Sequence, residues 1–328
     1  MDGSGYFNPY SGHTFWGVLL QLPIRLWAFL RGELSLENLA SDEIQVVVLI
    51  GVAASSALVG TFLVLKKMTM LANSLSHTIL IGIVIAFLWT HHSSEAGHNH
   101  HYQEINITAL LIAALIMGLV TTFLTEMLTK VVKLQEDAST GLVFTTLFAI
   151  GVIALTVLTR NAHIGTEIVM GNVDALQLED CKLVYIILGI NILSIGLFFK
   201  EFKITSFDPG LSRALGFAPV FFNYLLMAQV SATTIGAFRA VGVLMVLAFI
   251  TGPVLTARML SHDLKRLLAL AVLIGSMAAV FGVALSRHLL TVYDIALSTA
   301  GIVVCIILVF YLIVVLTQRF RYKLGFSY

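Results

Sequence analysis

The chain has 328 residues, of which 58% are hydrophobic and 11% are charged. A typical soluble domain carries roughly 25% charged residues, so this composition excludes an ordinary soluble protein and indicates a polytopic membrane protein. The net charge of +1 indicates nothing about partners, and we expect no nucleic-acid partner. Cys181 and Cys305 are the only cysteines, which excludes a disulfide framework and a cysteine metal cluster.

Long apolar segments recur along nearly the whole chain, and they are continuous rather than alternating. A bilayer core about 30 Å thick needs about 20 apolar residues per helical span, whereas a membrane strand would alternate apolar and polar residues. We therefore predict an all-α fold, a polytopic bundle of membrane helices that contacts lipid.

The first segment, residues 1–43, is predicted to be an N-terminal tail followed by an interfacial helix. Its start lacks the basic, apolar and small-residue regions of a removable signal peptide. Residues 14–30 are apolar but short, with Pro23 and Arg25 in the middle. An interfacial or re-entrant helix is therefore favoured over a complete span.

The transmembrane domain is predicted to comprise residues 44–318, followed by a cytoplasmic tail at 319–328. No polar stretch is long enough to form a second, soluble domain. About nine spans are expected, with eight or ten as alternatives. Their expected positions are about 44–65, 74–90, 107–128, 140–159, 181–199, 219–236, 238–258, 266–286 and 294–317.

Lysine and arginine residues cluster after alternate spans, and these clusters predict the orientation of the chain. The positive-inside rule places all of them in the cytoplasm. The clusters are Lys66 with Lys67, Lys130 with Lys133, Lys200 with Lys203, Lys265 with Arg266, and Arg319 with Arg321 and Lys323.

The loop after the fifth predicted span contains signals for a short cytoplasmic helix. Asp208 suits a helix N-cap, Pro209 suits the first helical turn, and Gly216 is a helix stop. The segment between them includes Arg213. Two interpretations stay open, an ordinary capped connector and a docking element for a soluble partner.

Several residues in or near the spans have a structural interpretation as their first explanation. Glycines let helices approach closely, and Gly-Pro bends a helix. Close packing is therefore the default interpretation of Gly236, Gly242, Gly252 and Pro253, with a moving gate as the second. Glu126, one turn from a cytoplasmic end, is interpreted as a snorkelling side chain with a structural role.

Five sequence blocks point to a known family. They are LVLKKMTMLANSLSHTILIGIVIA, VKLQEDASTGLVFTTLFAIGV, SFDPGLSRALGF, VGVLMVLAFITGPVLTARML and FGVALSR. The order and spacing of these blocks resemble those of the zinc, manganese and iron permease family of ABC importers. The resemblance extends from about residue 44 to about 317. In that family two permease subunits form the pore, two cytoplasmic ATPases drive it, and an extracytoplasmic protein delivers the metal ion.

The resemblance implies a permease domain at 44–318 in the bacterial cytoplasmic (inner) membrane, with a second permease that is either identical or a paralogue. It assigns residues 208–216 as the coupling helix that seats in the ATPase, with Asp208, Pro209, Arg213 and Gly216 as its signature. It also accounts for the missing Gly-x-x-x-x-Gly-Lys-Ser/Thr phosphate loop. We therefore expect no enzyme activity on this chain and no resident cofactor, with the divalent ion as cargo.

Asn73 and His77 are the candidate pore ligands. Four residues apart, they lie on one face of a helix and can converge on one ion. A hydrogen-bonded packing histidine is the alternative interpretation of His77. The family pattern is similar to Gly-Asp-Ala-Leu-Ser-His, so Asn73 stands where an aspartate is expected. Its neutral amide should hold a divalent cation less tightly.

Two outer features are further candidates for metal binding. Glu167 lies near a Gly-Asn pair where the family has an aspartate and a histidine, and it is either an anionic ligand or a solvated loop acid. The loop that follows the second predicted span either collects transition metals or is a flexible, solvated loop. Its histidines are His91, His92, His98, His100 and His101.

The leading hypothesis is a permease subunit that moves manganese, iron or zinc into the cytoplasm with ATP hydrolysed by a separate subunit. An ion-coupled secondary transporter is one alternative, but it would need acids or bases inside the spans, which are scarce here. An ABC permease for a metal chelate such as a siderophore or cobalamin is another. A membrane enzyme lacks support, because no zinc-protease or nucleophile-elbow motif occurs.

Overall fold

The computed structural model describes residues 9, 10, 12, 14–31, 39–94, 107–159, 173–176 and 178–323. Within these residues every regular element is helical, as the all-α prediction requires. The elements are α1 (Phe15–Leu30), α2 (Ser41–Leu65), α3 (Thr69–Ser94), α4 (Ile107–Lys130), α5 (Glu136–Thr159), the 3-10 turn η2 (Val173–Ala175), α7 (Leu178–Leu197), α8 (Phe199–Phe207), α9 (Pro209–Ala214), α10 (Pro219–Val241), α11 (Val243–Leu260), α12 (Leu264–Tyr293) and α13 (Thr299–Lys323).

Each predicted span corresponds to one long helix of the described chain, and the helix ends differ from the predicted ends by up to several residues. Seven of these helices are long and apolar enough to cross a membrane, namely α2, α5, α7, α10, α11, α12 and α13. The other two, α3 and α4, have 26 and 24 residues, lengths that reach across a bilayer core of about 30 Å. The predicted fold class, a polytopic helical bundle, is confirmed.

The predicted break between spans 219–236 and 238–258 is misplaced. Helix α10 continues through Gly236 to Val241, and the chain turns at Gly242, which has a φ of 79°. Glycine adopts this positive φ without the steric penalty of a Cβ atom, so the second glycine ends the helix. At Gly236 an added Cβ would lie 2.2 Å from Cδ1 of Ile187, so this glycine serves packing.

Helix α8 is an element that the sequence did not predict. Its charged residues Lys200, Glu201 and Lys203 make the segment resemble a loop. In the structure Phe202 is fully buried, with its ring centroid 5.3 Å from Phe62 and 5.6 Å from Phe222. The segment is therefore an amphipathic helix at the end of the bundle, and it leads directly into α9.

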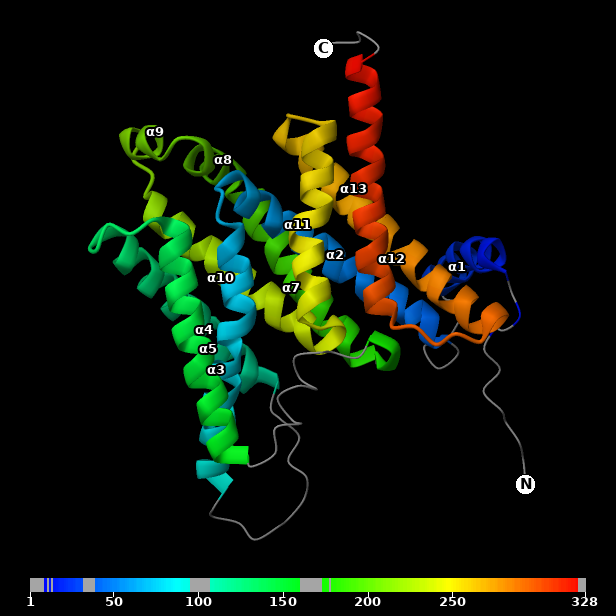
Figure 1. Cartoon of the computed structure of the whole chain (residues 1–328), viewed down its shortest axis with the longest axis horizontal. Coiled ribbons are helices and arrows are strands. Elements are labelled where there is room, and N and C mark those ends of the chain that lie inside the picture. Colours follow the sequence, from blue (N-terminus) through cyan, green and yellow to red (C-terminus); the bar gives the residue numbers. More distant parts are fainter. Residues whose placement is uncertain are drawn as a thin grey trace.

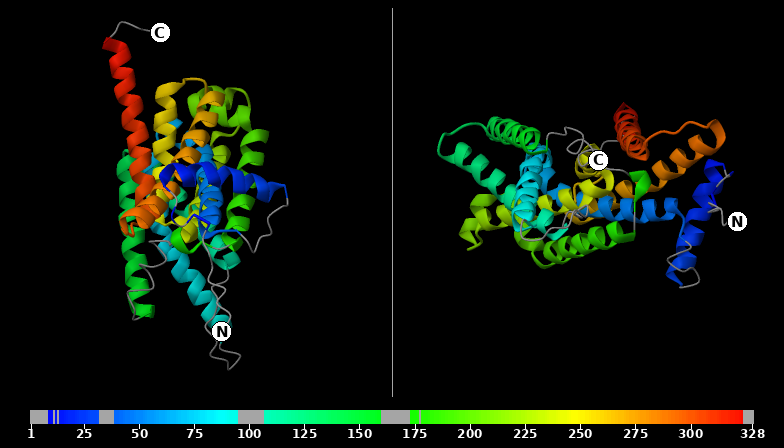
Figure 2. Two further views of the ribbon diagram at one scale, coloured as in Figure 1. Left: turned by 90° about the vertical axis from the view of Figure 1, so that its right-hand side faces the viewer. Right: turned by 90° about the horizontal axis from the view of Figure 1, so that it is seen from below.

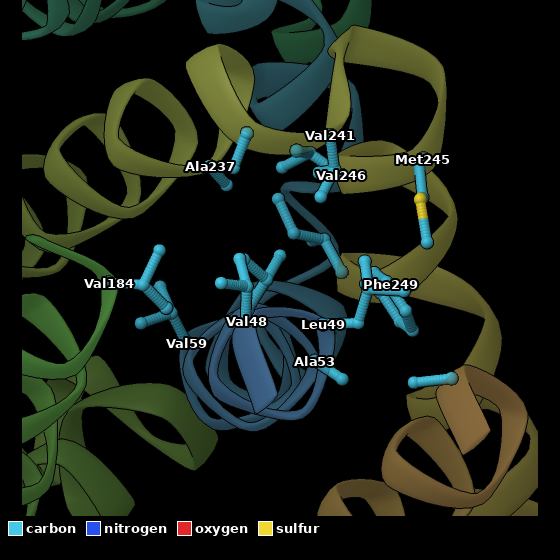
Figure 3. Packing of buried hydrophobic residues seen from close by; sticks show 14 of the residues in the cluster. Val48, Leu49, Ala53, Val59, Val184, Ala237, Val241, Met245, Val246 and Phe249 are labelled. Carbon is cyan, nitrogen blue, oxygen red and sulfur yellow. The ribbon is translucent and has the colours of Figure 1, made fainter. Parts of the chain in front are cut away.

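Helix α2 lies at the centre of the molecule. In the most apolar stretch of 18 residues in α2, 83% of the residues are buried. The corresponding share is 22% in each of α5, α7 and α13. Figure 3 shows α2 end-on, with Val48 and Leu49 directed toward α10 and α11, and with Val59 on the side of α2 that faces α7. Because lipid tails are as apolar as these side chains, close packing rather than transfer from water holds such helices together.

Glycines set the closest helix approaches. A Cβ on Gly60 of α2 would lie 2.1 Å from the carbonyl oxygen of Ile250 in α11, and one on Gly118 of α4 would lie 1.8 Å from Oγ of Ser231 in α10. Gly252 is similarly close to α13, and α11 continues through Pro253 as one helix. These contacts support the packing interpretation of the glycine-rich segment.

The long helices form two groups (Figure 1). Helices α3, α4 and α5 pack on one another at one side of the molecule, and α10 joins them to α2. Helices α8 and α9, the α4–α5 turn and the C-terminal end of α13 lie toward the same end of the bundle. The basic clusters on these elements therefore share one end, which supports the predicted orientation.

Helix α1 packs against α12 and runs across the direction of the long helices (Figure 2). Its 16 residues fall short of the roughly 20 that a span requires, in keeping with the interfacial interpretation. The phenol of Tyr10 donates a hydrogen bond to Oε1 of Glu43 at 2.7 Å, and Arg25 pairs with the same buried carboxylate. These contacts fasten the N-terminal segment to the start of α2.

Candidate functional site

Asn73 and His77 both lie on α3, with the spacing that the sequence predicts. Both side chains are half-buried, whereas Leu75 and Thr78 between and beside them are fully buried. The helix therefore turns Leu75 and Thr78 inward and leaves Asn73 and His77 on a face that is partly open. The structure thus brings the two candidate ligands to one accessible side of a membrane helix.

The imidazole of His77 packs against two aromatic rings of α5. Its centroid lies 5.1 Å from that of Phe144 and 5.5 Å from that of Phe148. These rings position the imidazole and restrict its rotation, while part of the side chain stays exposed. A neutral imidazole held in this way can still offer a ring nitrogen to a metal ion.

A row of threonines on α4 leads from this part of α3 toward the end of the bundle that carries the basic clusters. The hydroxyl of Thr121 lies 3.1 Å from the hydroxyl of Thr78, which joins α4 to α3 one residue after His77. Thr121, Thr125 and Thr129 each donate to the backbone carbonyl four residues earlier. Thr121 and Thr125 are buried, so their hydroxyls lie inside the bundle rather than on the partly open face of Asn73 and His77.

A cavity of about 230 Å³ lies at the end of this threonine row that is predicted to be cytoplasmic. The carboxylate of Glu126 on its wall accepts hydrogen bonds from Asn223 and Tyr224 of α10. Lys66, just past the end of α2, lies nearby; burial lowers its pKa to about 8, although Glu126 and Glu136 act in the opposite direction. The cavity is lined by Met68, Leu71, Thr122, Thr125, Glu126, Thr129, Lys130, Glu136 and Asn223.

The outer candidate ligands are not placed by the structure. Glu167 and the histidines His98, His100 and His101 lie outside the described residues, and His91 and His92 belong to the last turn of α3. Among the residues that are described, no group of three or more histidine, cysteine, aspartate or glutamate side chains could hold a metal ion. The metal-binding roles of these residues stay predictions.

Helix α9 has the cap that the sequence predicts. The Oδ1 atom of Asp208 accepts hydrogen bonds from the backbone N–H groups of Gly210 and Leu211, both at 2.9 Å. Pro209 is the first helical residue, Arg213 lies in the last turn, and Gly216 after the helix has a φ of 84°. Leu211 and Leu215 are half exposed, and both interpretations of the segment, a capped connector and a docking element, stay open.

A buried polar cluster in the middle of the bundle was missed from the sequence. The amide nitrogen of Asn191 in α7 donates to the hydroxyls of Ser55 and Thr233, both at 2.7 Å. Asn191 is 1% exposed. The sequence signal for this cluster was Asn191 itself, because an asparagine is unusual inside an apolar span.

A second group that sequence reasoning missed lies at the outer end. The guanidinium of Arg287 pairs with buried Asp42 at 2.5 Å. Thr299 donates to Asp174 at 2.6 Å and lies 2.9 Å from the hydroxyl of Ser286. These residues line a cavity of about 330 Å³ between α2, α12 and α13. The ion pair joins α12 to α2, and the contact between Thr299 and Ser286 joins α13 to α12.

The arrangement is that of an integral membrane helix bundle, with a capped helix at the end that carries the basic clusters. The sequence of residues 41–318 matches the ABC 3 transport family, and the chain belongs to that family. The resemblance found in the sequence blocks is thereby confirmed.

Curated relatives extend over most of the chain. It is 41% identical to the "Probable metal transport system membrane protein" of Chlamydia muridarum, over 93% of each chain. It is 38% identical to the manganese transport system membrane protein of Bacillus subtilis, over 72% of this chain and 79% of that protein.

A solved structure has the same fold. PsaBC from Streptococcus pneumoniae, in complex with Fab, is similar with a TM-score of 0.69 over 88% of this chain and 95% of that chain. At 24% identity this likeness establishes the architecture of the helices alone.

Proposed function

We propose that the chain is the permease subunit of an importer that moves a divalent transition-metal ion, manganese, iron or zinc, into the cytoplasm. The observation that carries the proposal is the half-buried pair Asn73 and His77 on one open face of α3, in a chain of the ABC 3 transport family. The manganese transport protein of B. subtilis, 38% identical, supports the choice of cargo.

The chemistry of this pair suits a transport site better than a storage site. An imidazole nitrogen binds manganese, iron and zinc, and an amide carbonyl oxygen adds a neutral, hard ligand. Two ligands do not complete a coordination sphere, so water or further groups must supply the others. Because the face is partly open, we propose that a second permease, identical or a paralogue, faces it across the pore. Weak binding allows the ion to leave again.

The energy source and the delivery of metal are assigned to partner chains. We propose that a cytoplasmic ABC ATPase docks on α9, where Leu211 and Leu215 are exposed beside the capped N-terminus. An extracytoplasmic metal-binding protein would load the opposite end. The proposed location is the bacterial cytoplasmic membrane, and the chain itself is proposed to have no catalytic activity and no resident cofactor.

The test is metal uptake into vesicles that contain the permease, its ATPase and its binding protein. We expect ATP-dependent uptake of manganese, iron or zinc, and we expect His77→Ala to reduce it by about 100-fold, because it removes the only imidazole ligand proposed for the pore. The matched control is His288→Ala, since His288 also packs against two aromatic rings, Phe15 and Tyr293, but at the outer end.

Other outcomes would favour the alternatives. Uptake that continues without ATP but requires a proton gradient would indicate an ion-coupled secondary transporter. Uptake of a siderophore or cobalamin in preference to free ions would indicate a chelate permease. If His77→Ala and His288→Ala behave alike, His77 has a packing role only.

A further inference from the structure

Glu126 of α4 accepts hydrogen bonds from several side chains at the cytoplasmic end of the bundle. Nδ2 of Asn223 donates to Oε1 at 3.0 Å, and the hydroxyl of Tyr224 donates to Oε2 at 3.2 Å. Nζ of Lys130 lies 3.2 Å from the same Oε2. The side chain of Glu126 is only 20% exposed, and screening by water is weaker there than on an open surface. The carboxylate therefore joins α4 to α10.

Asn223 extends this connection to a third helix. Its Oδ1 accepts a hydrogen bond from Nζ of Lys66 at 3.5 Å, just past the end of α2. A single amide thus donates to Glu126 of α4 and accepts from Lys66. Three helix ends that are far apart in sequence meet at one side chain.

The same region is directly connected to α9. Asn223 and Tyr224 lie in the second turn of α10, which begins at Pro219. The backbone N–H of Phe217 donates to the carbonyl of Ser212 at 3.0 Å, which closes the end of α9. Only residues 215–218 separate α9 from α10, so a displacement of α9 would be passed to the start of α10 through a short connector.

The connection also borders the inner end of the candidate metal path. Glu126 and Asn223 line the cavity of about 230 Å³ together with Leu71. Leu71 lies two residues before Asn73 on α3. A change in the separation of α4 and α10 would therefore change the shape of this cavity beside the first turn of α3, the helix that carries Asn73 and His77.

We infer that Glu126 is a positioning residue that holds the cytoplasmic ends of α4 and α10 together through Asn223 and Tyr224, so that displacement of α9 opens or closes the inner end of the metal path. This inference rests on the proposed function. The competing role, a cation site at Glu126, is disfavoured because the ammonium of Lys130 already pairs with this carboxylate.

In the hydrogen bond between Asn223 and Glu126, two substitutions can exchange the donor and the acceptor. Asn223→Asp alone removes the amide donor and places two carboxylates side by side, which breaks the connection. Adding Glu126→Gln restores a hydrogen bond in the opposite direction and returns the net charge to its original value. Glu136→Gln is the matched control, because Glu136 lines the same cavity from α5.

The first measurement is the distance between nitroxide labels on α4 and α10 in the purified permease. The labels replace Met127 and Val220, which are both 45% exposed, after Cys181 and Cys305 have been changed to serine. We expect Asn223→Asp to lengthen and broaden the distance distribution, and the double variant to restore it. An unchanged distribution in Asn223→Asp, or no recovery in the double variant, would overturn the inference.

This measurement needs neither ATP nor metal, so its failure is distinct from failure of the proposed function. If Asn223→Asp does not fold, the distance distribution of Glu126→Gln is compared with that of Glu136→Gln instead.

The second measurement is the amount of metal taken up per ATP hydrolysed in the full assembly. We expect roughly tenfold less for Asn223→Asp, because a charge-assisted hydrogen bond is lost, and recovery to within about twofold in the double variant. Glu136→Gln should stay at the wild-type ratio. An equal loss in Glu126→Gln and Glu136→Gln would show that negative charge in the cavity, rather than the connection, matters.

Discussion

His77 and Asn73 differ in how firmly their surroundings position them. The imidazole has two aromatic neighbours, Phe144 and Phe148, with ring centroids 5.1 and 5.5 Å away. Asn73 lies one helical turn nearer the cytoplasmic end, is half-buried and carries no charge. An ion that reached both would meet one positioned nitrogen ligand and one neutral oxygen ligand. Its binding would then depend on water and on groups from a facing subunit.

Asn73→Asp is expected to strengthen metal binding and slow transport. A carboxylate adds a full negative charge to the site, so the half-saturating metal concentration should fall by roughly tenfold. The maximal uptake rate should also fall, because a tightly held ion leaves slowly. The measurement is initial uptake rate against metal concentration, with Asn73→Ala as the control. An unchanged half-saturating concentration in Asn73→Asp would remove Asn73 from the path.

Asn191 is expected to contribute to stability rather than to transport. Asn191→Ala removes the amide donor and leaves the buried hydroxyls of Ser55 and Thr233 only their contact with each other at 3.3 Å, which should cost about 1–3 kcal/mol. The measurement is thermal unfolding of the purified protein in detergent. Removing all polar partners together, with Ser55→Ala and Thr233→Val added to Asn191→Leu, should be nearly neutral. If the triple variant is the least stable, the interpretation is wrong.

At the scale of elements, α8 and α9 show how differently two adjacent short helices are encoded. The N-cap, first-turn and stop signals of α9 are local, and Asp208, Pro209 and Gly216 occupy the positions that those signals predict. Helix α8 has no such signals, and it forms because Phe202 packs between Phe62 and Phe222. A capped helix can be recognised by itself, whereas an amphipathic helix of nine residues depends on its partners.

Loss of the α9 cap is expected to weaken ATPase docking. Asp208→Ala leaves two backbone N–H groups without their acceptor, which costs about 0.5–2 kcal/mol of helix stability. We expect roughly three- to tenfold weaker binding of the ATPase to the reconstituted permease. Asp208→Asn keeps an oxygen acceptor and should restore binding. If Asp208→Asn is as weak as Asp208→Ala, the charge of Asp208 is responsible rather than the cap.

At the scale of the whole molecule, α2 organises the bundle and the basic residues orient it. In the most apolar stretch of α2, 83% of the residues are buried. The helices packed on α2 include α7, α10, α11 and α12. The elements that carry the lysine and arginine clusters lie toward one end (Figure 1). That end also carries α9 and the cavity beside Glu126, so the proposed coupling elements all lie on the predicted cytoplasmic side.

The orientation can be checked with single cysteines in a chain whose Cys181 and Cys305 have been changed to serine. Gln135→Cys lies in the exposed α4–α5 turn, and Ser298→Cys lies in the exposed connection before α13. A membrane-impermeant maleimide should label Ser298→Cys in intact cells, and Gln135→Cys only after permeabilisation. The reverse pattern would invert the topology and exclude α9 as an ATPase contact.

Much of the fold could be predicted from sequence, because hydropathy and helix caps are properties of short segments. The positions of the spans, the family and the cap at Asp208 were all available in this way. The end of α10 was expected near Gly236, and the helix continues to Val241, because hydropathy locates an apolar segment without fixing its last residue. The close approach of Gly236 to Ile187 appears only in the tertiary structure.

The sequence by itself determined an all-helical membrane protein and the helical spacing of Asn73 and His77, and it predicts the orientation of the chain. Only the tertiary structure decided which polar groups meet. The bond between Asn223 and Glu126 spans 97 residues, and that between Asn191 and Ser55 spans 136. Such pairs depend on the rotation and separation of packed helices, which are set by close approaches such as that at Gly118 and have no signature in any short segment.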